Sequence, residues 1–286
     1  MSQWHHEILH DSYRQSFESE TLLFDTCSEH QRIQIFETPL WGRVMLLDQI
    51  VQTTERDEFI YHEMFAHVPC FAHGAPRSVL IIGGGDGGLL REVLKHAGIE
   101  RVVLVEIDAE VIELCKTYLP QHSQGAFSDP RVEVVIADGA AYLDTTSTTF
   151  DLILSDSTDP IGPGEVLFEQ SFYQKALNHL NPKGILVTQN GVSFLQLGEL
   201  RTTHQRLSRC AQYHGFYQAV VPTYIGGAMH FAWASPSAPC DQVTVESLAS
   251  RFEAAQIKTR YYHPALHAAS FVLPQYVNEA CIRSTS

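Results

Sequence analysis

The pattern of apolar and polar positions divides the chain into two parts. Up to residue 56, short and partly alternating runs are separated by Asp, Ser, Pro and Gly, which is typical of half-buried strands joined by turns. We therefore predict a small N-terminal antiparallel β domain in residues 1–56 and a second domain in residues 57–286. The strands predicted in the first domain are Thr21–Asp25, Arg32–Glu37, Gly42–Asp48 and Ile50–Thr54.

A helix is predicted where the two parts meet. Ile60, Met64 and Val68 recur at the i, i+4, i+8 spacing of one helix face, over residues 55–68. Thr54 and Asp57 provide a start signal for it.

From Ser78 onward, continuous apolar runs alternate with stretches of helical periodicity. Parallel strands need long crossover connections, usually helices, so this alternation predicts an α/β fold with a mostly parallel sheet and helices on both faces. The predicted strands are Val79–Ile82, Val102–Glu106, Val132–Ile136, Phe150–Leu154, Gly184–Gln189, Tyr217–Val221 and His230–Ala234. The predicted helices cover residues 89–97, 108–118, 168–180 and 195–213.

Composition and charge argue against several classes of protein. The 286 residues include 33 acidic and 19 basic side chains, a formal charge of −14 without any basic cluster, so we expect neither nucleic acid nor membrane as a partner. The six cysteines form no C-x-x-C pair and no apolar run reaches 18 residues, which favours a cytoplasmic protein. The H-E-x-x-H match at His6–His10 lacks a preceding scaffold, and we expect no metal site.

The segment Gly83–Gly88 reads G-x-G-x-x-G between a predicted strand and a predicted helix. Glycines at Gly83 and Gly85 allow the backbone to approach a ligand closely, although a tight turn without a ligand has the same pattern. Glu106 ends the next strand, where a carboxylate accepts both hydroxyls of a ribose. Together these features predict a nucleoside ligand.

Carboxylates recur at the ends of four successive predicted strands, at Asp86, Glu106, Asp138 and Asp156, and Asp159 follows as a fifth. Any one of them is explained equally well as a helix N-cap, but together they surround the crevice where open α/β sheets bind ligands. A pyrophosphate there would repel each close carboxylate by about 4 kcal/mol. The pattern favours a cationic adenosyl compound, and decarboxylated S-adenosylmethionine over its carboxylated parent.

The segment Asp156–Glu165 contains two prolines and two glycines, which predicts a loop, and a loop over the crevice mouth would act as a lid.

These segments together resemble the polyamine aminopropyltransferases, and within them the bacterial spermidine synthases. The resemblance extends from Trp4–Glu7 to Leu273–Tyr276, almost the whole chain. The motifs that carry it are Gln52–Glu63, Gly83–Gly88, Val105–Asp108, Asp138–Gly139, Asp156–Pro163 and Pro222–Tyr224.

The resemblance implies a Rossmann-like, methyltransferase-type catalytic domain and assembly into a homodimer or homotetramer. It implies that decarboxylated S-adenosylmethionine is held by Gln31, Gly83, Gly85, Asp86, Glu106, Asp138, Gly139 and Pro163. Of these, Gln31, Glu106, Asp138, Gly139 and Pro163 would hold its adenosine part. The amine substrate would contact Tyr61, His62, Asp86, Asp156, Ser157, Thr158, Asp159 and Tyr224, with Asp156 as the catalytic base. His62 stands where many eukaryotic members carry Gln.

The implied reaction transfers an aminopropyl group from decarboxylated S-adenosylmethionine to putrescine or a similar diamine, giving spermidine and methylthioadenosine. The resemblance therefore implies no cofactor, because the transferred group comes from the co-substrate decarboxylated S-adenosylmethionine. Two alternatives remain open at this point: an S-adenosylmethionine-dependent putrescine N-methyltransferase, and a catalytically silent nucleoside-binding module.

Overall fold

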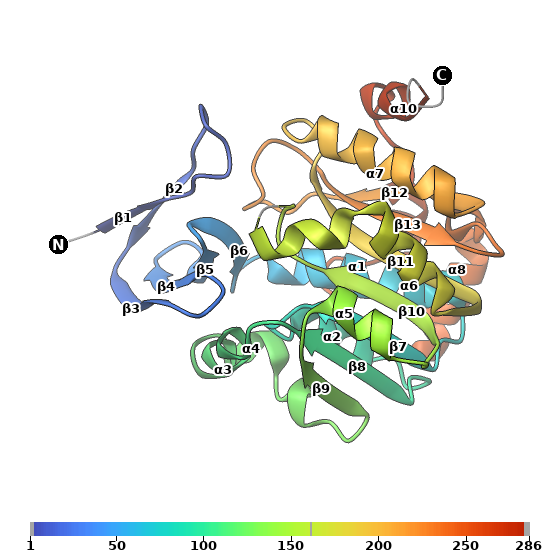
Figure 1. The fold of residues 1–286 in the computed structure, drawn as a ribbon, viewed down its shortest axis with the longest axis horizontal. Helices are drawn as coiled ribbons and strands as arrows, with labels where there is room; N and C mark the ends of the chain where they lie inside the picture. Colours follow the sequence, from blue (N-terminus) through green and yellow to red (C-terminus); the bar gives the residue numbers. More distant parts are fainter. Residues whose placement is uncertain (1–2, 161, 283–286) are drawn as a thin grey trace.

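The computed structural model describes residues 3–160 and 162–282, except the side chains of Pro163 and Ile282. Its centre is a seven-stranded sheet in the order β12-β13-β11-β10-β7-β8-β9 (Figure 1). The five strands from β11 to β9 run parallel, and β13 and β12 are antiparallel additions at one edge, so the predicted mostly parallel sheet is confirmed. The strands are β7 (Ser78–Gly83), β8 (Arg101–Glu106), β9 (Val132–Ile136), β10 (Phe150–Asp156), β11 (Leu180–Val192), β12 (Tyr213–Ala219) and β13 (Met229–Ser235).

Successive residues of the central strands face opposite layers of helices. In β7, Val79 and Ile81 join one hydrophobic cluster, whereas Leu80 and Ile82 join the other. Both faces are buried, which explains the continuous apolar runs in the sequence. The first layer contains α1 (Glu58–His73), α2 (Gly88–Leu94), α8 (Val245–Ala255) and α9 (Pro264–Ser270). The second contains α5 (Gly139–Thr145), α6 (Gln170–Asn178), α7 (Leu197–Cys210) and α10 (Gln275–Ile282).

The N-terminal part forms two small antiparallel sheets beside this core (Figure 1). A hairpin of β1 (Gln3–His6) and β2 (Ser16–Ser19) precedes a four-stranded sheet of β3 (Thr21–Cys27), β4 (Arg32–Thr38), β5 (Gly42–Leu47) and β6 (Ile50–Thr54). The four predicted strands are therefore confirmed. The domain boundary expected at residue 56 falls between β6 and α1, and we keep it as a proposal.

One face of the four-stranded sheet packs against α3 (Ala109–Tyr118) of the larger domain. The two sides of this contact are made by Ile33, Ile35, Met45 and Leu47 of the sheet and by Val111, Cys115 and Leu119. Because this contact is apolar and buried, it fixes the N-terminal sheet over the C-terminal edge of the parallel strands.

Several elements differ from the sequence prediction. Helix α1 begins three residues later than expected, because the Thr54 hydroxyl donates to Asp57 at 2.6 Å and residues 55–57 form a turn. Strand β12 begins earlier than expected, at Tyr213, and Val220 lies outside it, exposed. The segment predicted as a loop after Asp156 contains the 3₁₀ helix η2 (Gly162–Phe168). Elements that were not predicted are β1, β2, α4 (Pro120–Ser123), η1 (Ala126–Ser128), α5, η3 (Cys240–Gln242), α8, α9 and α10.

Within the described ranges, the structure contains no helix that is both long and apolar enough to cross a membrane.

Candidate active site

Two adjoining cavities open at the C-terminal edge of the parallel strands, beside the point where the chain order reverses between β7 and β10. The first encloses about 1020 Å³ and the second about 520 Å³ of empty space, solvent at their mouths included. They share a wall formed by Gln52, Tyr61, Ser157, Thr158 and Tyr224.

Most of the residues predicted from the sequence line the first cavity. These are Gln31, Tyr61, His62, Gly83, Gly85, Asp86, Glu106, Asp138, Gly139, Asp156, Ser157, Thr158 and Tyr224. Asp159 lies in the second cavity, not beside the other four carboxylates, because the chain continues three residues past the end of β10. The side chain of Pro163 lies outside the described residues.

The glycine loop brings the ends of β7 and β10 into contact. The register pairs Gly83 with Asp156, and the Gly84 N–H donates to the Asp156 backbone oxygen at 3.0 Å. Gly83 has φ +80°, and a Cβ there would lie 2.1 Å from that same oxygen. Only glycine fits this close approach, which keeps the Asp156 side chain beside the loop.

The carboxylate of Glu106 forms part of the first cavity at the end of β8. It accepts the Asp108 backbone N–H at 3.0 Å, and a Cβ at Gly85 would come within 2.9 Å of it. Burial raises the pKa of Glu106 to about 7, although the Asp108 N–H opposes the shift. Ligand hydroxyls that donate to this carboxylate would stabilise its ionised form.

Gln31 reaches the first cavity from the turn between β3 and β4. Its amide donates to Asp108 at 3.1 Å, and Asp108 also caps α3 by accepting the Glu110 N–H. Met45, Leu47 and Val111 add apolar surface to the same cavity. A polar amide beside apolar side chains suits a flat ring that carries polar edges.

Asp138 is both a helix N-cap and a residue of the cavity lining, the two roles considered for the strand-end carboxylates. Its Oδ1 accepts the Ala141 N–H at 2.8 Å and caps α5, while the residue lines the first cavity.

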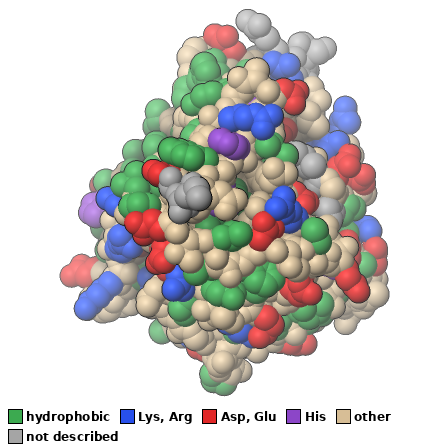
Figure 2. All heavy atoms as spheres, turned by 90° about the vertical axis from the view of Figure 1, so that its left-hand side faces the viewer, with side chains coloured by type: hydrophobic (Ala, Val, Ile, Leu, Met, Phe, Trp, Pro, Cys, Tyr) green, Lys and Arg blue, Asp and Glu red, His purple; other side chains and the backbone are tan. Residues whose placement is uncertain are grey.

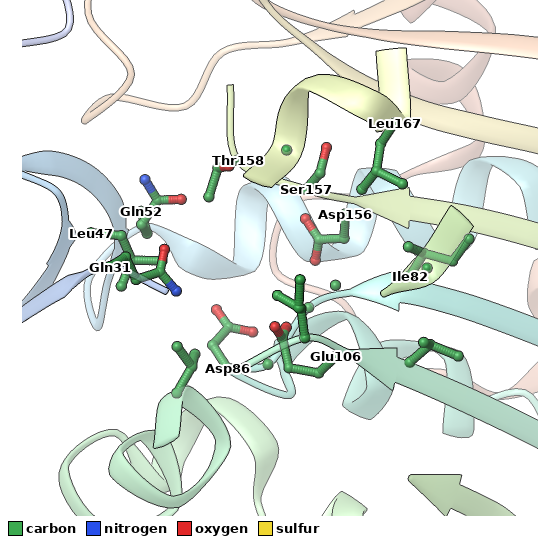
Figure 3. A pocket seen from close by; sticks show the side chains of 18 of the residues that line it. Gln31, Leu47, Gln52, Ile82, Asp86, Glu106, Asp156, Ser157, Thr158 and Leu167 are labelled. Carbon is green, nitrogen blue, oxygen red and sulfur yellow. The ribbon is translucent and has the colours of Figure 1, made fainter. Parts of the chain in front are cut away.

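Asp156 lies next to the wall that the two cavities share. Its Oδ1 accepts the hydroxyl of Tyr61 at 2.6 Å, which fixes the carboxylate. Burial and the nearby Asp86 charge raise the pKa of Asp156 to about 6, against the opposing effects of His62 and Tyr61. Figure 3 shows Asp156 facing Asp86 and Glu106 across the open centre of the cavity.

A positive charge offsets this group of acids. His62 of α1 is buried, and its Nε2 lies 3.4 Å from Asp86 Oδ2. Burial favours the neutral ring, but the carboxylates of Asp86 and Glu58 outweigh it and raise the pKa of His62 to about 10. His62 in turn holds the pKa of Asp86 well below its usual value, against the effect of burial.

The second cavity contains Asp159 at a site separate from Asp156. The Gln196 amide donates to Asp159 Oδ1 at 2.6 Å, and burial raises the pKa of Asp159. Glu7 and Gln189 belong to the same lining, and the Gln189 amide donates to the Thr158 backbone oxygen.

The polar lining residues without a role predicted from the sequence include Gln52, Gln189, Gln196 and Glu7. Glu7 and Gln52 stood within motifs that carried the resemblance, so a signal existed for them. Gln189 and Gln196 lie in or after β11 without any local pattern that marks them.

The family follows from comparison with known proteins. The model described as "Spermine/spermidine synthase domain" matches residues 58–245, and the one described as "Spermidine synthase tetramerisation domain" matches residues 3–55. The chain belongs to the spermine/spermidine synthase family.

Curated relatives and solved structures agree with this membership. Polyamine aminopropyltransferase 1 of Pseudomonas aeruginosa is 56% identical over 96% of each chain, and the polyamine aminopropyltransferase of Pseudomonas syringae pv. tomato is 53% identical over 98% of each. A crystal structure of a spermidine synthase in complex with the transition state analogue AdoDATO superposes with a TM-score of 0.93, at 38% identity over 98% of this chain and 95% of that one. The spermidine synthase of Thermotoga maritima gives a TM-score of 0.89, at 37% identity over 98% and 94%.

Proposed function

We propose that the protein is a spermidine synthase, which transfers the aminopropyl group of decarboxylated S-adenosylmethionine to putrescine and releases spermidine and methylthioadenosine. The relatives named as aminopropyltransferases support this reaction class over a methyltransferase or a silent binding module. The complex of a similar spermidine synthase with AdoDATO, a transition state analogue of that enzyme, supports the same choice.

The observation that carries the proposal is the place of Asp156 in the first of two acidic cavities, beside the wall that they share. Asp86, Glu106 and Asp138 lie in the first cavity and Asp159 lies in the second. Neither cavity has Lys or Arg among its described lining residues. Such a site suits two cationic substrates and disfavours phosphate groups.

The chemistry needs a base but no acid. An alkyl amine with a pKa of about 10.4 is neutral in only about one molecule per thousand at pH 7. As the neutral nitrogen attacks the methylene carbon next to the sulfonium, a C–N bond forms, the C–S bond breaks and its electron pair stays on sulfur. The proton that the substrate's ammonium group must lose before this attack passes to Asp156, the new secondary ammonium stays charged, and the thioether leaves uncharged.

The two cavities divide the substrates between them in this proposal. The nucleoside lies with Gln31, Glu106 and Asp138, and its aminopropyl end points to Asp86. The diamine extends from Asp156 to Asp159, past the rings of Tyr61 and Tyr224, which meet edge to face with centroids 5.8 Å apart. A carboxylate on the sulfonium substrate would be repelled by Asp86, which disfavours S-adenosylmethionine.

A product assay with a panel of amines tests the proposal. Decarboxylated S-adenosylmethionine is incubated with 1,3-diaminopropane, putrescine, cadaverine or spermidine, and the products are identified by mass spectrometry. We expect methylthioadenosine with each accepted amine and the fastest turnover with putrescine. Methylated amine from S-adenosylmethionine, or no methylthioadenosine with any amine, would contradict the proposal.

We further propose that the reaction uses no cofactor besides this co-substrate and takes place in the cytoplasm. No group of three His, Cys, Asp or Glu side chains in the described ranges is arranged to hold a metal ion. Turnover in excess EDTA tests the first point, and fractionation of the source cells tests the second.

The N-terminal sheets are the proposed site of assembly into a homodimer or homotetramer. Large apolar side chains are exposed there, namely Trp4, Tyr13, Leu22 and Leu40. Figure 2 looks onto this side of the molecule and shows hydrophobic side chains among charges of both signs. Light scattering on the intact chain distinguishes the two assemblies from a monomer.

A further inference from the structure

His62 is held between two carboxylates. Its Nδ1 lies 2.6 Å from Glu58 Oε2, one helical turn earlier in α1, and its Nε2 lies 3.4 Å from Asp86 Oδ2. The ring also contacts Gly88, where a Cβ would come within 2.3 Å of it. The orientation of the imidazole is therefore fixed by its surroundings.

This geometry decides the charge of the ring. An ionised carboxylate only accepts hydrogen bonds, and a neutral imidazole carries one N–H and one acceptor nitrogen. Each ring nitrogen of His62 faces an ionised carboxylate. The unprotonated nitrogen of a neutral ring would therefore point its lone pair at an oxygen of Glu58 or Asp86, which cannot donate a hydrogen bond to it. Both nitrogens satisfy their neighbours only when both carry a proton, as in the imidazolium cation.

Glu58 is itself held in its ionised form. Arg91 of α2 donates to the same Oε2 at 2.9 Å, and its Nη1 donates to the backbone oxygens of Gln121 and His122. The side chains of His62, Glu58 and Arg91 are 4%, 8% and 9% exposed, so water screens these charges little. Both partners keep the pKa of Glu58 below its usual value, although burial opposes this.

We infer that Glu58, supported by Arg91, is a positioning residue that keeps His62 permanently cationic beside Asp86, and that this fixed charge favours the neutral, nucleophilic form of the bound amine. The inference rests on the proposed function, because it assigns to the cation an effect on the reacting nitrogen.

The physical reason is electrostatic. A positive charge in the cavity wall disfavours a second positive charge on an amine nearby and so lowers the amine's pKa. It also opposes the rise in the pKa of Asp156 that burial causes, so this base stays ionised at neutral pH. The titratable or charged groups that face His62 are Glu58 and Tyr61 of α1, Asp86, Arg91 of α2, His122 of α4 and Asp156 of β10.

The charge of His62 is measurable without any assay of activity. In the wild-type protein, ¹⁵N chemical shifts of its ring should show both nitrogens protonated at pH 8. In Glu58→Gln the ring should lose its proton at a midpoint at least about one pH unit lower, because a close opposite charge shifts a pKa by one to three units. A neutral His62 in the wild-type protein at pH 8 would overturn the inference even if the variant fails to fold.

The pH dependence of turnover then tests the effect on the amine. Below the new His62 midpoint, kcat of Glu58→Gln should stand in a constant ratio to that of the wild type. Above it the ratio should fall, because a one-unit rise in the amine's pKa makes the neutral form about tenfold rarer. A ratio that does not change with pH through this midpoint would reduce Glu58 to a structural role and overturn the proposal.

Glu63→Gln is the matched control. Glu63 is a buried glutamate on the same helix, and its carboxylate accepts backbone N–H groups of residues 260–262 instead of contacting His62. This variant should lose stability without any pH-dependent change in the kcat ratio. If the wild type made no methylthioadenosine, the proposed function would fall, while the ¹⁵N measurement would still test the charge of His62.

Discussion

Asp156 has the three properties that a general base needs, namely access to the substrate, a fixed orientation and a suitable pKa. It borders the wall shared by the two cavities, accepts a hydrogen bond from Tyr61 at 2.6 Å and has a pKa raised to about 6. At pH 7 it is therefore mostly ionised, yet more basic than an ordinary aspartate.

Asp156→Asn keeps the shape of the side chain and removes the proposed base. We expect kcat to fall by about 10²- to 10⁴-fold, the usual contribution of general base catalysis. Methylthioadenosine affinity, measured by calorimetry, should stay within a few-fold, because Glu106 and Gln31 are untouched. Asp144→Asn, at an exposed residue paired with Lys175, is the control. Turnover within a few-fold of wild type would show that Asp156 is not the base.

The pH profile should report the same carboxylate. The proposed base works only when ionised, and its pKa in the ligand-free site is raised to about 6, so kcat/KM for the amine should fall as the pH drops through about 6. An unshifted aspartate would place this limb near pH 4. In Asp156→Asn the limb at pH 6 should be absent from the residual activity, and its persistence there would assign it to another group.

At the scale of residues, the site side chains that could be predicted from the sequence are those that the secondary structure brings together. Asp86, Glu106, Asp138 and Asp156 were predictable because parallel strands end at one edge. Glu58 stands in the Gln52–Glu63 motif, but its role could not be predicted from its position, because a glutamate in a helix is normally solvated and the burial of Glu58 depends on Arg91 from a different helix.

Among the elements, the turn after β7 depends on its first glycine. Gly83→Ala forces a positive φ on alanine and places its Cβ 2.1 Å from the Asp156 backbone oxygen. We expect a loss of about 1–3 kcal/mol in the free energy of unfolding from urea denaturation, together with a lower kcat, because β10 must move.

Gly198→Ala is the matched control for this loss. Gly198 lies in α7, and apart from its chain neighbours and the nearby helix backbone, no atom of the described residues lies within 4 Å of the position that an alanine methyl group would take, so alanine there should be neutral or stabilising by up to about 1 kcal/mol. Equal unfolding free energies for the two variants would contradict the close approach at Gly83.

The central strands that were predicted from their apolar runs share one physical property, burial on both faces. Strands β7, β8 and β10 carry long runs of Val, Ile and Leu, which indicate a buried strand without further information. Helix α5 is too short for its periodicity to be recognised, and the half-exposed start of β12 at Tyr213 lacks an apolar run. Their positions depend on packing against the rest of the sheet.

For the whole molecule, the charge of −14 should act on substrate capture. Both proposed substrates are cations, so their encounter with an acidic protein is accelerated by attraction that salt screens. We expect kcat/KM for putrescine to fall several-fold as ionic strength rises from about 0.01 to 0.3 M, while kcat changes little. A kcat/KM independent of salt would show that the net charge has no part in capture.

The contact between the N-terminal sheet and α3 links assembly to ligand binding. Met45 and Leu47 from one side of this contact and Val111 from the other also line the first cavity, so the pocket exists only while the two domains are docked. A nucleoside bound there bridges both domains and stabilises their docked arrangement by mass action. Methylthioadenosine should therefore slow hydrogen exchange of β4 and β5, and a chain that lacks the N-terminal sheets should lose the nucleoside site along with any subunit interface.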